Sequence, residues 1–207
     1  MNRKAIKYSI GILVIGLLGY NSVYFQPLDR KLADGNEISF DAKAYVEGIW
    51  GNELRMVYKD APDIALLIDS LEQNTVAAFE TYGYALGIGN IGYFRVQGVG
   101  LVTAVNNNNV LLQVGSHVIE VETEFVYGNA IRDASGLVKL NDYDNSSDFN
   151  SISESINEKI RKELIPEFRS KVKIGDKVRF EGAIELNKAH LKLSRIEVIP
   201  ITLQITE

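Results

Sequence analysis

The stretch that decides the fold is residues 93–124, YFRVQGVGLVTAVNNNNVLLQVGSHVIEVETE, in which apolar and polar side chains alternate. A period of two indicates β-strands, and two turns divide the stretch into strands at 93–105, 110–114 and 118–124. The run of four asparagines at 106–109 favours the first turn, because asparagine tolerates the backbone of tight turns. The sequence therefore predicts three consecutive strands.

After these strands the pattern becomes helical and then returns to a period of two. Ser151 and Glu154 fit a capping box at a helix start, and Pro166 is expected to end or kink that helix. Strands are then predicted at 177–186 and 190–205. Three strands, a helix and two strands are the order of an oligonucleotide/oligosaccharide-binding (OB) barrel. We therefore expect an α+β protein whose residues 84–207 form an OB-like five-stranded antiparallel barrel, with the helix between strands 3 and 4.

Residues 40–83 carry helical signals and predict a small helical subdomain before the barrel. Asp41 fits as the N-cap of a helix that begins at Ala42. A longer helix is expected over 62–82, with Asp60 as its N-cap and Gly83 as its stop.

The N-terminus has the layout of a targeting segment. Arg3, Lys4 and Lys7 precede an uncharged run over 8–25, which suits a signal peptide or a short transmembrane helix. We favour an uncleaved anchor at 1–25, because the small residues that signal peptidase requires are missing, and a tether at 26–39; a cleaved signal is the alternative. The basic start predicts a single pass through the inner (cytoplasmic) membrane, with the C-terminal domain in the periplasm.

Composition excludes several functions. The chain has no cysteine, so thiol catalysis, disulfides and a cysteine-linked lipid are excluded. Without the three basic residues of the N-terminal segment, 19 basic side chains stand against 27 acidic ones, a net charge of −8. That charge disfavours nucleic acids and anionic membrane surfaces as partners.

Several motifs, taken in order, resemble one known family. They are Phe40-Asp41-Ala42, Tyr82-Gly83, the run Val96-Gln97-Gly98-Val99-Gly100, Gly128-Asn129-Ala130-Ile131-Arg132-Asp133-Ala134, and Asn141-Asp142-Tyr143. The chain resembles the predicted periplasmic lipoproteins of domain-of-unknown-function family 2291 over about residues 40–200. The resemblance implies export, membrane attachment and an accessory role beside sugar-type ABC transport systems, but it supplies no catalytic residues. The chain departs from the family in lacking the lipobox cysteine.

The polar stretch after the third strand holds the best candidates for a ligand site. Arg132 offers a planar fork of donors, and loops at a barrel mouth commonly carry function. The candidate ligand-binding residues are Asn129, Arg132, Asp133, Asp142 and Asn145. The alternative is that Arg132 and Asp133 only brace the long loop.

Other motifs are weaker. Residues 142–148 begin like a calcium loop, but Ser147 and Ser153 replace its glycine and glutamate. The GxGxxG letters at 87–92 lie between a helix and a strand, where no dinucleotide motif occurs. The two histidines, His117 and His190, are too few for a zinc site. We expect no metal, no cofactor and no catalysis.

Two functions remain. The first is a non-catalytic, membrane-anchored accessory protein that binds an ABC transporter component or a solute-binding protein. Such binding needs an exposed aromatic patch, for which Tyr45, Trp50 and Tyr58 are the candidates. The second is a module that binds a sugar-like solute at the barrel mouth.

Overall fold

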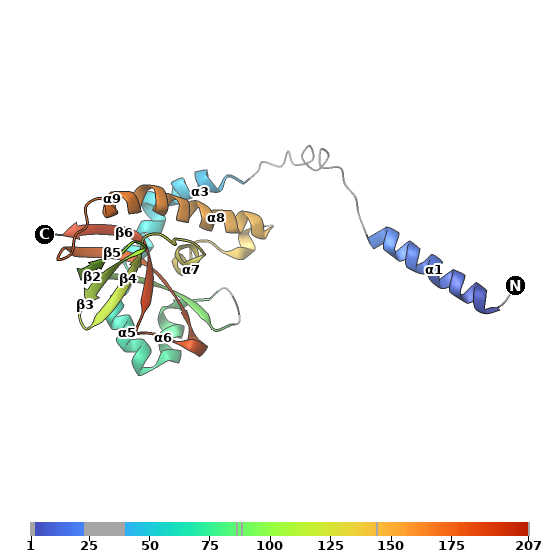
Figure 1. Cartoon of the computed structure of the whole chain (residues 1–207), viewed down its shortest axis with the longest axis horizontal. Helices are drawn as coiled ribbons and strands as arrows, with labels where there is room; N and C mark the ends of the chain where they lie inside the picture. The colour runs from blue at the N-terminus through green and yellow to red at the C-terminus, as the bar shows by residue number, and fades with distance from the viewer. Residues whose placement is uncertain (1–2, 23–39, 86, 88, 144, 207) are drawn as a thin grey trace. The chain divides into compact units, whose positions relative to one another are not determined.

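A computed structural model of the chain describes residues 3–22, 40–85, 87, 89–143 and 145–206 (Figure 1). The chain divides into two compact units, Met1–Phe40 and Asp41–Glu207. The first contains helix α1 (Arg3–Ser22); the predicted tether, 26–39, and the end of the predicted anchor, 23–25, lie outside the described residues. Across the described parts of the chain, no helix combines the length and the apolarity that a membrane crossing requires. The structure thus does not support the predicted transmembrane helix.

In the second unit, five strands close into a barrel. They are β2 (Ile91–Val105), β3 (Asn109–Val114), β4 (His117–Glu122), β5 (Lys177–Asn187) and β6 (Ile196–Thr206). The described strands are ordered β1-β2-β3-β4-β6-β5, and β2 pairs with β5 to close the ring. The short β1 (Gly83–Tyr84) adds to β2 as a sixth strand.

The predicted all-antiparallel pairing is wrong at one place. Ile119–Val121 of β4 and Ile196–Val198 of β6 run parallel. The chain between these strands is long and contains several helices and strand β5, and parallel neighbours do require a long connection. The second prediction to be corrected is the start of the last strand, which is at Ile196 and not at 190, because a short 3₁₀ turn, η4 (Lys188–His190), and a loop come first.

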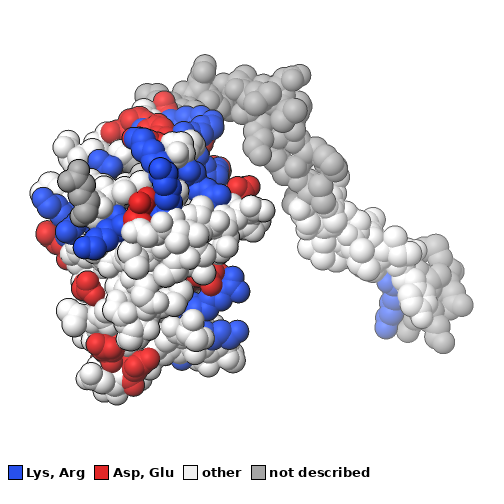
Figure 2. All heavy atoms as spheres, turned by 60° about the vertical axis from the view of Figure 1, so that its left-hand side comes forward, with Lys and Arg blue, Asp and Glu red and all other residues white. Residues whose placement is uncertain are grey.

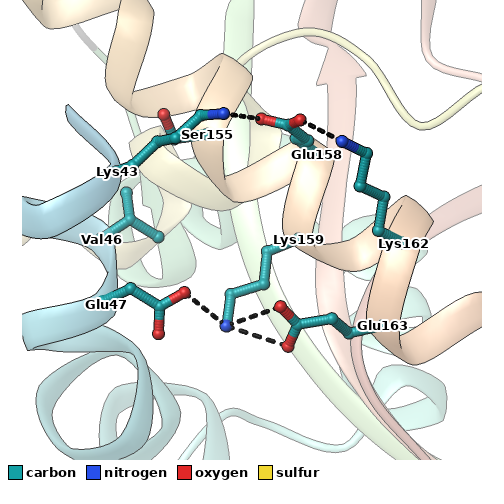
Figure 3. A pocket seen from close by; sticks show the side chains of 8 residues that line it. All are labelled: Lys43, Val46, Glu47, Ser155, Glu158, Lys159, Lys162 and Glu163. Atoms are coloured by element: carbon teal, nitrogen blue, oxygen red, sulfur yellow. Dashed lines mark hydrogen bonds and ion pairs between the residues drawn. The ribbon is translucent and has the colours of Figure 1, made fainter.

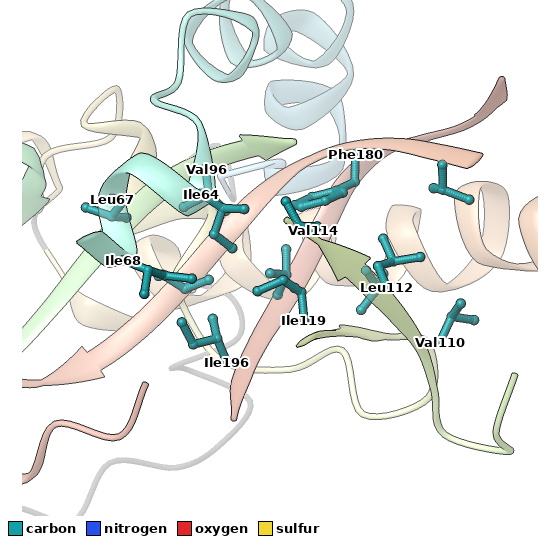
Figure 4. Close-up of a cluster of buried hydrophobic side chains, with 14 of the residues drawn as sticks. Ile64, Leu67, Ile68, Val96, Val110, Leu112, Val114, Ile119, Phe180 and Ile196 are labelled. Atoms are coloured by element: carbon teal, nitrogen blue, oxygen red, sulfur yellow. The ribbon is translucent and has the colours of Figure 1, made fainter. Parts of the chain in front are cut away.

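The core fills the barrel and the space between the barrel strands and helix α5. On β2, Phe94, Val96 and Val102 point inward and are buried, as the alternation predicts. Figure 4 shows side chains of α5 meeting those of the strands. The labelled residues of this cluster are Ile64, Leu67, Ile68, Val96, Val110, Leu112, Val114, Ile119, Phe180 and Ile196. Each such side chain contributes about 1.5–3 kcal/mol when it is fully buried.

Short helices precede the barrel: α3 (Ala42–Ile49), the π-turn η1 (Trp50–Leu54), α4 (Arg55–Lys59), α5 (Ile64–Gln73) and α6 (Thr75–Tyr82). Asp41 caps α3 as predicted, accepting a hydrogen bond from the backbone N–H of Ala44. The single helix predicted over 62–82 is two helices, because Asn74 is extended and caps α6 through the N–H of Ala77. The cap of α5 is Asp63 and not Asp60.

Between β4 and β5 the chain forms α7 (Ala130–Ser135), η2 (Leu140–Asp142), α8 (Ser146–Lys159), the π-segment η3 (Ile160–Leu164) and α9 (Ile165–Arg169). The predicted capping box is wrong, since α8 begins earlier and Asn145 caps it through the N–H of Asp148. Pro166 does not end the helix but lies in the first turn of α9, where its missing N–H is harmless.

Candidate functional site

Arg132 lies inside the molecule, on the short helix α7. Its side chain is 1% exposed. Its Nε donates a hydrogen bond to Oδ1 of Asp133 (2.7 Å) and its Nη1 donates to the carbonyl oxygen of Phe149 (2.8 Å). The guanidinium also lies 3.5 Å from the centroid of the Phe149 ring, a favourable cation–π contact. Arg132 therefore fastens α7 to the first turns of α8.

This geometry favours the bracing alternative for Arg132. Its guanidinium is occupied by groups of the protein and is shielded from solvent. Charged side chains are almost never fully buried unless they are paired, and Asp133 supplies the opposite charge for Arg132. A ligand could reach Arg132 only if α7 and α8 moved apart.

Asp133 differs from Arg132, because half of its carboxylate has no partner. The side chain is 1% exposed, and Oδ1 is taken by Arg132. Among the described residues, no group hydrogen-bonds to Oδ2. Burial raises the pKa of this carboxyl, while the hydrogen bond and the charge of Arg132 act in the opposite direction. A buried acceptor without a donor costs about 1–3 kcal/mol. Such groups are rare in proteins, so the unpartnered Oδ2 needs a structural or functional explanation.

A pocket of about 380 Å³ lies against Asp133. Its other lining residues are Tyr84, Ala85, Gly136, Val138, Lys139, Leu140 and Asn141. Gly136 ends α7 with a left-handed backbone (φ 68°), which turns the chain so that the residues after it border the same pocket as Asp133. A Cβ at position 136 would lie 2.6 Å from Cε1 of Tyr84, so the ring packs directly on the glycine.

The predicted ligand residues are only partly brought together. Asp133 lines the pocket, but Asn129, Asp142 and Asn145 do not. Asn129 is the N-cap residue of α7, Asn145 caps α8, and Asp142 is exposed in η2. Tyr84, Lys139 and Asn141 were not among the candidates. Gly136 was the available signal, because a glycine just after a short helix predicts a reversal of the chain.

The predicted aromatic patch needs a correction at Tyr58. This side chain is 0% exposed, and its hydroxyl donates to the carbonyl oxygen of Ile131 (2.7 Å). It is therefore part of the core and not of a surface. Tyr45 and Trp50 are half-buried. Burial and a hydrogen bond with Tyr45 raise the pKa of Tyr143.

The surface around α3, α8 and α9 is densely charged. On the face drawn in Figure 2, positive and negative side chains are interspersed at the end of the barrel unit that carries these helices. Figure 3 shows the groove of about 190 Å³ between α3 and α8, which two ion-pair clusters bridge. Lys159 lies 2.6 Å from Glu47 and 2.9 Å from Glu163, and its Nζ lies 5.6 Å from the Trp50 ring centroid. Glu158 accepts from Lys43 and Lys162. Because these charged groups are already paired with one another, we interpret the groove as a contact between helices and not as a binding site.

No metal centre is found in the parts of the chain that the structure describes, where no three His, Asp or Glu side chains are placed to hold an ion. The calcium-like run 142–148 includes residue 144, which lies outside the described residues.

Comparisons with known proteins agree with this fold. The family model described as "Predicted periplasmic lipoprotein (DUF2291)" matches residues 13–204. The chain belongs to this family. The resemblance seen in the sequence is thereby confirmed, and the description of DUF2291 supports a location outside the cytoplasm.

Among solved structures, the DUF2291 chain is similar to an OB-fold protein from Thermotoga maritima. The TM-score is 0.73 at 26% identity, covering 81% of this chain and 99% of that one. This likeness confirms the predicted OB barrel. No curated protein matches the chain.

Proposed function

We propose that this DUF2291 protein is a non-catalytic accessory protein of a carbohydrate-type ABC uptake system, attached to the inner membrane by its N-terminal segment and working on the periplasmic side. The observation that carries the proposal is the division of the chain into an N-terminal unit that contains α1 and a folded unit, Asp41–Glu207. The family description supports the location. Because the chain has no cysteine, the N-terminal segment replaces the lipid as the means of attachment.

Attachment is tested with two measurements on the full chain. Alkaline phosphatase fused after Glu207 is active only outside the cytoplasm, so activity is expected in intact cells. After carbonate extraction the protein should stay with the membranes, and its intact mass should include the N-terminal segment. A mass that lacks residues 1–20 or more would replace the anchor by a cleaved signal. Replacing Arg3, Lys4 and Lys7 by glutamate is the control, since it removes the basic bias that sets orientation.

Partner binding is tested by isolating the full-length protein from its native membranes in mild detergent and identifying what comes with it. A permease, an ATPase or a solute-binding protein at near-stoichiometric amounts is the expected result. Tyr45 and Trp50 are the proposed contact residues, because both are partly exposed on the helices that precede the barrel. Trp50→Ala should reduce recovery of the partner, while Phe125→Ala, an exposed aromatic after β4, should not. Recovery of the protein alone would contradict the accessory function.

A second candidate function is the binding of a small solute. The observation that favours it is a pocket lined in part by Asp133, a residue whose carboxylate has one buried oxygen without a partner among the described residues. Pockets of about 300–1,000 Å³ with a few converging polar groups are the usual form of a small-molecule site.

A further inference from the structure

We propose that the pocket bounded by Tyr84, Asp133, Gly136, Lys139 and Asn141 binds a neutral polyhydroxy compound of monosaccharide size, with a ligand hydroxyl donating to Oδ2 of Asp133. The inference rests on the second candidate function and identifies its site and its class of ligand. It is independent of the accessory function.

The first step is the need of Asp133 for a donor. Oδ1 is engaged by Arg132 at 2.7 Å, but Oδ2 is buried and has no partner among the described residues. Buried polar groups in proteins are nearly always hydrogen-bonded, and Asp133 lines a pocket, so a ligand in that pocket is the proposed source of the missing donor. The pocket, about 380 Å³, is far larger than the roughly 30 Å³ that one water occupies.

The second step is charge, which selects a neutral ligand. Asp133 is already paired with Arg132, so the pair carries no net charge. Of the other lining residues only Lys139 is charged, and it is basic. A cationic ligand would therefore meet no free negative charge. An anion could pair with Lys139, but without a hydroxyl of its own it would leave Oδ2 without a donor, because an ionised carboxylate oxygen can only accept.

The third step is hydrogen-bonding capacity. A hydroxyl group both donates and accepts. One hydroxyl can donate to Asp133, and others can accept from the ammonium of Lys139 or exchange hydrogen bonds with the amide of Asn141. Both rim residues are exposed, so they are available to a ligand. A polyhydroxy compound satisfies all three groups at once, whereas a purely apolar ligand would leave Asp133 without a donor.

The fourth step is the aromatic wall. Tyr84 is held in place by two contacts, since its ring packs on Gly136 and the guanidinium of Arg95 lies over the ring, 5.4 Å from its centroid. Arg95 in turn donates to the carbonyl oxygen of Val57 (2.8 Å). A ring fixed in this way offers a rigid apolar surface at little cost in conformational entropy, as aromatic residues in binding sites do. Tyr84 is 39% exposed, so the C–H groups of a sugar can contact the part of the ring that Gly136 and Arg95 leave open.

The test uses the full-length protein in detergent and titrates it with D-glucose, D-ribose and myo-inositol, followed by calorimetry and ligand-observed NMR. Choline and phosphate are the charged comparison probes. At least one polyol is expected to bind with a dissociation constant in the micromolar to millimolar range, about 10⁻⁶–10⁻³ M. Asn141→Ala and Lys139→Ala should each weaken it about tenfold, roughly 1.4 kcal/mol. Asp133→Asn should weaken it further.

The matched control is Asp142→Ala, since this exposed neighbour of Asn141 does not line the pocket; it should leave binding unchanged. Because Asp133→Asn could disturb the fold, the location of the site is decided by Asn141→Ala and Lys139→Ala. The melting temperature of both variants should equal that of the wild type. No binding of any polyol, or binding of choline or phosphate instead, overturns the ligand class. Polyol binding that Asn141→Ala and Lys139→Ala leave intact overturns this site while the solute-binding function stands. Recovery of a transporter partner affects neither result.

Discussion

At the scale of single residues, we expect the free energy of unfolding to depend strongly on Arg132. Removing its side chain would leave the buried Asp133 carboxylate without its ion pair and the Phe149 carbonyl without a donor. Breaking a buried pair from one side typically costs about 3–5 kcal/mol. We expect Arg132→Ala to lower the free energy of unfolding by about that amount, measured by urea denaturation at pH 7.

The double variant Arg132→Ala, Asp133→Ala distinguishes two causes of the lost stability, the broken ion pair and the cavity that the missing side chain leaves. Because it removes both buried charges, it should be more stable than the single arginine variant, and the cycle should give a clear coupling energy. A single variant whose stability stays within about 0.5 kcal/mol of the wild type would contradict the bracing role.

The sequence drew attention to Arg132 and Asp133 but could not reveal their burial. Charged residues in a polar stretch are normally exposed, and the group that covers Arg132, Phe149, lies 17 positions away on another helix. The same holds for the pocket. Asp133 was a candidate, yet Tyr84 and Asn141 join it only through the packing of β1 and the turn at Gly136, and no local pattern encodes that packing.

At the scale of helices, two residues can be compared as the N-cap of α8, Asn145 in the structure and Ser151 in the sequence-based prediction. The capping box that the sequence predicted at Ser151 lies inside the helix, where the Ser151 hydroxyl donates to the carbonyl oxygen of Asp148. The true cap, Asn145, accepts from the N–H of Asp148 at 2.8 Å. Asn145→Ala should therefore cost about 1 kcal/mol of stability, measured by thermal and urea unfolding.

Two substitutions serve as controls for this cap. Asn145→Asp keeps an accepting oxygen and should retain most of the stability. Ser151→Ala should have little effect or a slightly stabilising one, since alanine is the better residue inside a helix. The reverse order, with Ser151→Ala the more damaging change, would restore the helix start that the sequence predicted.

The contact between α3 and α8 should depend on pH through Glu158. Hydrogen bonds from Lys162 and then Lys43 lower the pKa of Glu158, so the folded protein binds this proton less tightly than the unfolded chain does. The stabilisation is therefore complete above the ordinary glutamate pKa of about 4.3 and is lost as the pH falls through the lowered value. Glu158→Gln should be less stable than the wild type near neutral pH, and the two should converge in acid.

Glu167→Gln is the comparison for this prediction. The pKa of Glu167 is also lowered, by Lys171 one turn away on the same stretch of chain, but that pair joins no separate helices. Added salt should reduce the effect of Glu158→Gln, because these charges are partly exposed and screened. A stability difference that persists unchanged at acidic pH would exclude an ionic origin.

At the scale of the whole molecule, the barrel was accessible from the sequence because it depends on alternation and strand order. Strands 93–105 and 177–186 were predicted within a few residues of β2 and β5, which close the ring. The parallel contact of β4 with β6 and the buried helix α7 were missed. Both depend on contacts between segments far apart in the chain, where tertiary packing decides the structure and local pattern does not.

Closure of the barrel should be most sensitive at Gly182, where β5 shifts register against β6. An added Cβ would collide with the backbone carbonyl oxygen of Ile199 and lie 2.7 Å from Cγ1 of Val198. Backbone within a sheet cannot yield as a side chain can, so Gly182→Ala should cost about 3 kcal/mol or more. At Gly98 the nearest atom would be Cζ of Phe180, at 2.9 Å, and a ring tip can shift. Gly98→Ala should therefore cost about 1 kcal/mol of stability. Urea unfolding of both variants measures the two costs. If Gly98→Ala were the more damaging change, the register shift between β5 and β6 would not be the most sensitive point of the barrel.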